Sequence, residues 1–310
     1  MKVVYMGTPD FAVKPLEALI ANNYEVVGVF TQPDKPVGRK AVLTAPPVKV
    51  VAENNNIPVF QPETLKNGVG VEILRDLNPD VVIVVAYGKI LPKDFLEFAK
   101  YGCINIHGSI LPKYRGAAPI QWSVLDGEEY AGVTSMQMNE GLDTGDILLV
   151  EKTKIEPDET SGDLYERLTV LGANVLLKTL DAVKSGSLTP VKQDDSKSSY
   201  AKMLDKSLSK INWNLSSEKV HNTIRGLDPW PVALTVFEGK NLKLFRSSVL
   251  DGEYNKAAGS VFKSKDGICV VCGDKKAVLI KEVQLEGKKR MSALDFSRGA
   301  NLSDGVVFES

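Results

Sequence analysis

Residues 80–87 read DVVIVVAY, and the β-branched run from Val81 to Val85 has no polar interruption. A strand with one solvent-facing side alternates apolar and polar residues, whereas a strand of a parallel sheet covered on both faces is apolar throughout. The run is also much shorter than the roughly 18–20 apolar residues of a membrane helix. Residues 80–87 therefore predict a strand buried on both faces of a parallel sheet.

Strand-like and helix-like segments alternate on both sides of this run. Strands are expected at 2–7, 25–31, 58–61 and 103–107, and helices at 11–22, 48–55, 69–77 and 95–99. The proline-rich residues 32–47 are expected to form a long loop. Because repeated β–α units join parallel strands through right-handed crossovers, the first half predicts an α/β fold with an open parallel sheet. Such sheets bind ligands at the carboxyl ends of their strands.

The pattern changes after a long helix expected at 160–185. Residues 187–209 are rich in Ser, Asp and Lys, which is typical of a linker. A short helix is expected next, at 217–227, and short strands follow at 233–237, 242–249, 259–262, 268–272 and 277–283. This series of strands predicts a small β-barrel. The expected domains are therefore 1–189 and 207–310, with a linker at 190–206.

Charge is distributed unevenly between these domains. The 310 residues include 38 Lys and Arg and 39 Asp and Glu, so the net charge is −1. That balance excludes a strongly basic nucleic-acid-binding protein as a description of the whole chain. Residues 1–206, however, hold 22 basic and 27 acidic residues, and residues 207–310 hold 16 and 12. A mildly basic barrel is compatible with a nucleic-acid surface.

The cysteines indicate a reducing compartment. Cys103, Cys269 and Cys272 are an odd number, and the first residues do not resemble a signal peptide. Cys269 and Cys272 form a C-x-x-C, but no second Cys/His pair supports a zinc site. We expect a cytoplasmic, monomeric protein without a metal site.

Two polar side chains stand at the end of the strand expected at 103–107. Asn105 and His107 lie two residues apart, so on a strand they point to the same face. A histidine exchanges protons near neutral pH, and an asparagine amide donates hydrogen bonds to a developing oxyanion. The pair therefore indicates a catalytic site at the carboxyl end of this strand.

Two loops supply further candidate groups. Residues 108–119 combine backbone-restricting residues with two cations, and residues 141–146, GLDTGD, place two carboxylates between glycines. The first is also compatible with a plain connector, and the second with a hairpin turn. A carboxylate beside His107 would orient the imidazole, which makes Asp143 a candidate partner.

These motifs resemble those of the folate-dependent formyltransferases. The resemblance rests on Asn105, on His107, on SILPKYRGAAPIQW at 109–122 and on GLDTGD at 141–146. It extends through MGTPDF at 6–11, FTQPDKPVGRK at 30–40, VVAYGKILP at 84–92 and IRGLDPWP at 224–231. Within this family the chain is most similar to the members that act on methionyl initiator tRNA.

The resemblance implies a Rossmann-like formyltransferase domain followed by a small, OB-like, tRNA-binding β-barrel domain. It implies that the formyl group of 10-formyltetrahydrofolate, the co-substrate, passes to the α-amine of methionyl initiator tRNA for the initiation of translation. It requires no metal.

Carried over by position, the resemblance also assigns site residues. The expected catalytic residues are Asn105, His107 and Asp143, the expected folate contacts are Ser109, Ile110, Leu111 and Pro112, and the expected tRNA contacts are Arg39 and Lys40 in the loop 33–47. The loop departs from the more basic run of many relatives, because Ala41, Val42 and Leu43 follow Lys40.

Two other functions fit part of this pattern. A folate-dependent formyltransferase or formyl hydrolase that acts on a small molecule would keep the three catalytic residues without needing a basic barrel or the Arg39 loop. A nucleotide-binding α/β module without catalysis is disfavoured, because the turn after the first strand, GTPD at 7–10, lacks the G-x-G-x-x-G pattern.

Overall fold

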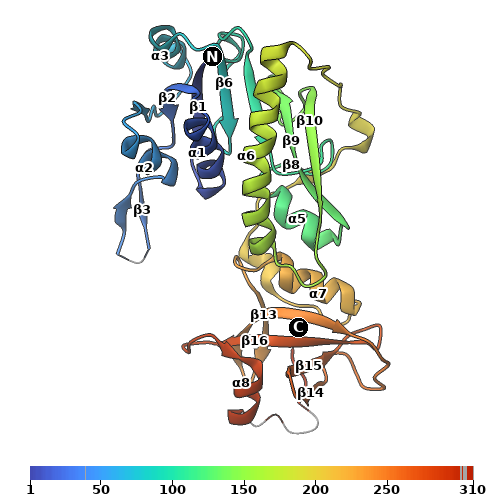
Figure 1. Ribbon diagram of the computed structural model, residues 1–310. Coiled ribbons are helices and arrows are strands. Elements are labelled where there is room, and N and C mark those ends of the chain that lie inside the picture. The colour runs from blue at the N-terminus through green and yellow to red at the C-terminus, as the bar shows by residue number, and fades with distance from the viewer. Residues whose placement is uncertain (39, 301, 303–305, 310) are drawn as a thin grey trace. The chain divides into compact units, whose positions relative to one another are not determined.

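The computed structural model describes residues 1–38, 40–300, 302 and 306–309, and Figure 1 shows their course. The chain divides into two compact units that interleave along the sequence. The first unit comprises Met1–Gly116, Gly132–Thr153 and Tyr165–Tyr200, and the second comprises Ala117–Ala131, Lys154–Leu164 and Ala201–Ser310. The domain boundaries expected at 189 and 207 stay a prediction.

Within the described residues, one seven-stranded sheet forms the first unit, in the order β10-β9-β7-β6-β1-β2-β5. Its parallel strands are β1 (Lys2–Gly7), β2 (Glu25–Phe30), β5 (Val59–Phe60), β6 (Val81–Val85) and β7 (Cys103–His107). The strand β6 holds the central position and every one of its residues is buried. The prediction drawn from its β-branched run is therefore confirmed.

The parallel-rich sheet confirms the expected α/β fold with an open parallel sheet, and one edge of it is antiparallel, which the sequence did not predict. Strand β9 (Tyr130–Gln137) runs antiparallel to β7, and β10 (Ile147–Lys154) lies beside β9. Apolar patterning missed β9 because Thr134 and Ser135 are fully buried in it. Their hydroxyl groups are bonded to a backbone carbonyl at 2.6 Å and a threonine hydroxyl at 2.7 Å, which removes most of the cost of burial.

Along the chain, helices of the first unit alternate with its strands, and Figure 1 shows both. They are α1 (Val13–Ala21) after a 3₁₀ turn η1 (Asp10–Ala12), α2 (Pro47–Asn54), α3 (Val69–Leu77), α4 (Lys93–Leu96) and the greater part of α6 (Ser161–Ser185). Helix α3 has the expected bounds. Helix α4 is a single turn that starts directly after Pro92, two residues before the short helix expected at 95–99, and Pro92 forms its N-cap with extended backbone.

Residues 32–47 contain a short hairpin, so the expectation of a long irregular loop is wrong for part of them. Strands β3 (Lys35–Val37) and β4 (Val42–Thr44) pair antiparallel, and their residues are all exposed. Pro36 lies in β3, which is an edge strand and therefore tolerates a residue without an N–H. The proline content of the segment consequently did not exclude a strand.

The second unit is built around an antiparallel sheet in the order β12-β13-β16-β15-β14, with β17 paired to β16. Its strands are β12 (Ala233–Phe237), β13 (Lys240–Leu250), β14 (Val261–Ser264), β15 (Gly267–Val271), β16 (Ala277–Leu285) and β17 (Met291–Ser292). Glu309 bridges Val236 in β12, and Val307 bridges Ser260 next to β14. These bridges cover both edges of the sheet, in agreement with the small β-barrel that the short strands predict.

Three helices complete the second unit: α5 (Pro119–Asp126), α7 (Ser217–Gly226) and α8 (Ala293–Gly299). Only α7 was expected from the sequence. Helix α5 packs its apolar residues into the core of the second unit, where Leu125 joins Ile224 and Leu227 of the α7 region. Because the residues that α5 packs against lie about a hundred positions further along the chain, the local sequence of α5 did not indicate a helix.

The central strand provides a direct test of this fold. We expect Ile83→Ala, at a fully buried position of β6, to lower the free energy of unfolding by about 2–5 kcal/mol, because it leaves a cavity between close-packed side chains. Ile90→Ala is the matched control, since Ile90 is 84% exposed and its loss should change stability by about 0.5 kcal/mol or less. Urea unfolding measures both, and equal effects would contradict the central position of β6.

Candidate active site

Asn105 and His107 lie at the carboxyl end of β7, a strand held on both sides. Asn105 pairs with Val84 of β6 and with Met136 of β9. The two polar residues are 8% and 6% exposed, although they carry hydrogen-bonding groups that are costly to bury unpaired. The sheet therefore presents them at fixed positions, one strand period apart on the same face.

The loop that carries Asp143 brings its carboxylate to these two side chains. Asn105 Nδ2 donates to Asp143 Oδ1 at 3.4 Å, and His107 Nδ1 lies 3.8 Å from the same oxygen. The other oxygen, Oδ2, accepts a hydrogen bond from the Gly116 N–H at 2.8 Å. The structure thus brings together the three residues that the sequence predicts, while their catalytic roles stay a prediction.

The hydrogen bonds of His107 define the tautomer of its ring. His107 Nε2 lies 2.9 Å from the main-chain oxygen of Tyr114, and a carbonyl oxygen can only accept, so Nε2 carries a proton. In the neutral imidazole, Nδ1 then holds the lone pair and faces Asp143. Both side chains are largely buried, at 7% and 11% exposed, so the Asp143 carboxylate is placed to orient the ring.

The GLDTGD loop needs its glycines for this geometry. A Cβ atom on Gly145 would lie 1.6 Å from the main-chain oxygen of Gln137, and one on Gly141 would lie 2.1 Å from Thr144 Oγ1. Asp143 itself adopts φ +52°, a left-handed conformation that aspartate tolerates better than most residues. Its carboxylate is therefore aimed by an unusual backbone conformation that the close-packed glycines permit.

Residues 109–112, the predicted folate contacts, form a tight turn after β7. Ser109 Oγ donates to the main-chain oxygen of Lys113 at 2.7 Å, and the Leu111 N–H donates to Thr134 Oγ1 at 3.2 Å. Ser109 and Leu111 are buried, whereas Ile110 and Pro112 are partly exposed. Contact with folate by these four residues stays a prediction.

Of the two predicted tRNA contacts, Lys40 lies between strands β3 and β4. Arg39 lies outside the described residues. Lys40 is exposed, next to Ala41 with its φ of +48°. Val37, Val42 and Leu43 are also exposed there, at 56%, 59% and 66%. The hairpin thus carries a cation and apolar side chains on a projecting segment.

Sequence reasoning missed two side chains that support the site, Arg115 and Gln193. Gln193 is 7% exposed and donates to the main-chain oxygens of Asp143 and Gly145, at 2.9 and 2.7 Å. Arg115 donates to Gln193 Oε1 through both Nε and Nη2. Gln193 lies in a stretch that composition marked as linker, and a lone glutamine among Ser, Asp and Lys gives no signal of burial.

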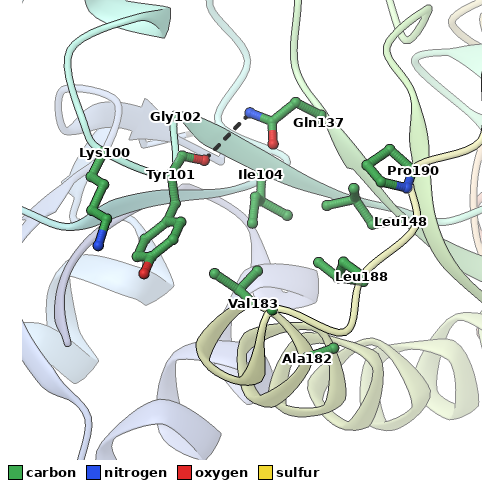
Figure 2. Close-up of a pocket in the computed structure, with 11 residues that line it drawn as sticks. Lys100, Tyr101, Gly102, Ile104, Gln137, Leu148, Ala182, Val183, Leu188 and Pro190 are labelled. Atoms are coloured by element: carbon green, nitrogen blue, oxygen red, sulfur yellow. Dashed lines mark hydrogen bonds between the residues drawn. The ribbon is translucent and has the colours of Figure 1, made fainter.

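A separate cavity of about 390 Å³ lies at the opposite, amino-terminal end of β7. Figure 2 shows Ile104, Leu148, Val183 and Leu188 around it, with the amide of Gln137 bonded to the main-chain oxygen of Tyr101. None of the predicted site residues lines it. This cavity is distinct from the candidate active site.

Among the described residues, His, Cys, Asp and Glu side chains form no group of three or more that is placed to hold a metal ion. Among the described helices, none is long and apolar enough to cross a membrane.

The second histidine of the chain, His221, is structural. It is 6% exposed, and its Nδ1 and Nε2 contact Ser247 Oγ at 2.8 Å and the main-chain oxygen of Pro157 at 2.9 Å. Burial is the main cause that lowers the pKa of His221. With both nitrogens bonded within the second unit, it has a packing role.

Comparison with known families identifies both halves of the chain. A family model described as formyl transferase matches residues 1–180, and a model described as formyl transferase, C-terminal domain, matches residues 203–301. The methionyl-tRNA formyltransferase of Lachnospira eligens is 50% identical over 313 residues, which cover 99% of each chain. That of Alkaliphilus metalliredigens is 48% identical over 99% of this chain and 98% of its own.

Solved structures show the same fold at low sequence identity. A sugar 3N-formyl transferase, WlaRD, solved with dTDP and 5-N-formyl-THF, has a TM-score of 0.70 and 23% identity, over 93% of this chain and 99% of its own. HypX from Aquifex aeolicus, solved in complex with tetrahydrofolic acid, has a TM-score of 0.64 and 16% identity, over 100% of this chain and 50% of its own.

The hydrogen bonds of the two histidines can be tested by ¹⁵N NMR of the imidazole rings. We expect neutral His107 to carry its proton on Nε2, and His221 to be less protonated than a free imidazole at the same pH because burial lowers its pKa. His221→Gln assigns the signals, since the chain contains only these two histidines. Asp143→Asn should shift the nitrogens of His107 alone, and a neutral His107 protonated on Nδ1 would contradict its contact with Tyr114.

Proposed function

Because the chain belongs to the formyl transferase family, we propose that it transfers the formyl group of 10-formyltetrahydrofolate to the α-amine of methionyl initiator tRNA. The meeting of Asn105, His107 and Asp143 at the carboxyl end of β7 carries this proposal. Full-length relatives named methionyl-tRNA formyltransferase, 46–50% identical, support the choice of substrates. The product would serve the initiation of translation.

In the reaction, the amine nitrogen forms a bond to the formyl carbon, and the bond from that carbon to the folate nitrogen breaks. After the first bond forms and before the second breaks, negative charge builds up on the formyl oxygen of the tetrahedral intermediate. Asn105 is suited to stabilise this oxygen, because its only amide contact to Asp143 is long, at 3.4 Å, and therefore weak. One donor of this kind typically lowers the barrier by about 3–4 kcal/mol.

His107 is suited to move the proton that the amine must lose and the folate nitrogen must gain. Its Nε2 is fixed by the Tyr114 carbonyl, so Nδ1 is the nitrogen that exchanges a proton. Asp143 Oδ1 lies 3.8 Å from Nδ1, too far for a direct hydrogen bond, and is placed to orient the ring. Positioned proton transfer of this kind typically accelerates a reaction about 10²–10⁴-fold.

The acceptor end of the tRNA would be held by Arg39 and Lys40, with the C-terminal domain supplying further basic residues. Lys40 and the exposed apolar side chains of the β3–β4 hairpin support this assignment. We further propose that residues 109–112 contact the folate, and that the protein acts as a cytoplasmic monomer without a metal.

A small-molecule acceptor is the alternative, as in the sugar formyl transferase of similar fold. Transfer of labelled formyl from 10-formyltetrahydrofolate distinguishes the two. We expect label on charged initiator tRNA and little on glycinamide ribonucleotide. Label released only as formate, or found only on the small molecule, would refute the proposed acceptor.

The catalytic assignments predict large losses of rate with an intact fold. We expect Asn105→Ala and Asp143→Ala each to lower kcat for formyl transfer by about 10²–10³-fold, since each removes a group that acts in the transition state. Asp146→Ala, three residues further along the same loop and exposed, is the control and should keep near-native turnover. Native turnover in Asp143→Ala would remove Asp143 from the mechanism.

If Arg39 and Lys40 contact the tRNA, their removal should weaken the binding of charged tRNA and leave the binding of folate unchanged. We expect Arg39→Ala and Lys40→Ala to raise KM for charged tRNA severalfold and to leave KM for the folate unchanged. Binding of tRNA should also weaken as salt is added, because phosphate contacts release counterions. Lys100→Ala, at the opposite end of β7, is the control. A flat salt response, or equal losses for both substrates, would contradict this assignment.

A further inference from the structure

The side-chain amide of Gln193 makes every hydrogen bond that it can form. Its Nε2 donates to Asp143 O at 2.9 Å and Gly145 O at 2.7 Å, and its Oε1 accepts from Arg115 Nε at 3.1 Å and Nη2 at 2.8 Å. An amide offers two N–H donors and one oxygen with two lone pairs, so this set is complete. At 7% exposed, Gln193 is buried although its neighbours, Lys192 and Asp194, are exposed.

These bonds close a ring around Asp143. The Gly116 N–H, adjacent to Arg115 in the chain, donates to Asp143 Oδ2 at 2.8 Å. Arg115 holds Gln193, and Gln193 holds the main-chain oxygen of Asp143. Segment 115–116 thus holds the side chain of Asp143 directly, through Gly116, and its backbone indirectly, through Arg115 and Gln193. The backbone of Asp143 has the unfavourable φ of +52°.

The same segment holds His107, and it is itself held by the stretch that contains Gln193. The Tyr114 carbonyl accepts from His107 Nε2, while the Tyr114 and Arg115 N–H groups donate to Ser199 Oγ and Ser199 O, both at 2.9 Å. Ser199 therefore fixes the backbone to which both His107 and Asp143 are bonded, whereas Gln193 bonds the side chain of Arg115. All of these residues belong to the first compact unit.

From this ring we propose that Gln193 is a positioning residue for formyl transfer, which fixes the Asp143 carboxylate against His107 through the backbone of the GLDTGD loop. The inference rests on the proposed function. Among the described residues, the side chain of Gln193 forms hydrogen bonds with Arg115 and with the main-chain oxygens of Asp143 and Gly145, so its link to the Asp143 carboxylate runs through the loop. Its neighbours from 192 to 199 are mostly exposed and polar, so Gln193 is not buried as part of an apolar segment that packs into the core.

Only an amide satisfies both sides of this position. Glutamate at 193 keeps the acceptor for Arg115 but sets a carboxylate oxygen against two carbonyl oxygens, which repel it. Methionine keeps the length and approximate volume and loses all four hydrogen bonds. Gln193→Glu and Gln193→Met therefore separate the donor side of the amide from its volume.

We expect both variants to lower kcat about 100-fold and to change KM for charged tRNA and for folate by less than about threefold, since a misplacement of about 1 Å costs that much in rate. Lys192→Ala, the exposed neighbour, should keep native kcat. Thermal unfolding confirms that the variants are folded at the assay temperature. Native kcat in folded Gln193→Glu and Gln193→Met would overturn the inference.

A double-mutant cycle separates positioning from general structural support. If Gln193 acts through Asp143, Gln193→Met should cause less than a threefold further loss in an Asp143→Ala background. A full 100-fold further loss would show a role independent of Asp143 and would overturn the inference. Native protein and Asp143→Ala are measured in the same assay, so failure of native protein to formylate charged tRNA would instead refute the proposed function.

Discussion

The hydrogen bond from the Gly116 N–H to Asp143 Oδ2 joins the two loops on which the candidate active site depends. Strand β7 fixes Asn105 and His107 by pairing on both sides, but Asp143 reaches them from a glycine-rich loop beyond β9. Holding such a loop in one conformation costs about 1–2 kcal/mol per residue in backbone entropy. The bonds from Gly116 and from Gln193 offset that cost where the carboxylate must lie.

Much of the fold follows from local pattern. The β-branched run of β6 needs no partner to be identified, because only a doubly covered strand is apolar throughout. The period of two in a strand places Asn105 and His107 on one face without knowledge of the fold. The carboxyl end of β7 is then the expected ligand position for a sheet of this kind.

Other features depend on contacts that sequence does not display. Strand β9 hides Thr134 and Ser135 in the core, and a buried hydroxyl with a partner looks like an exposed one in a sequence. Helix α5 packs on residues a hundred positions further along the chain. Gln193 sits in a stretch with the composition of a linker, and only its four hydrogen bonds reveal that it is a buried part of the site. Composition identifies solvent-compatible residues, not residues whose polar groups are satisfied internally.

Proton transfer by His107, with the Asp143 carboxylate beside it, is the step on which the proposed reaction depends. Its most direct test is the single-turnover rate, with protein in excess over charged initiator tRNA and 10-formyltetrahydrofolate saturating, for native protein and Asp143→Asn. The substitution keeps the size of the side chain and removes its charge. A rate that falls at least about 100-fold, with the bound fraction of tRNA unchanged, is the predicted result. A single-turnover rate equal to that of the native protein would show that the charge of Asp143 takes no part in formyl transfer.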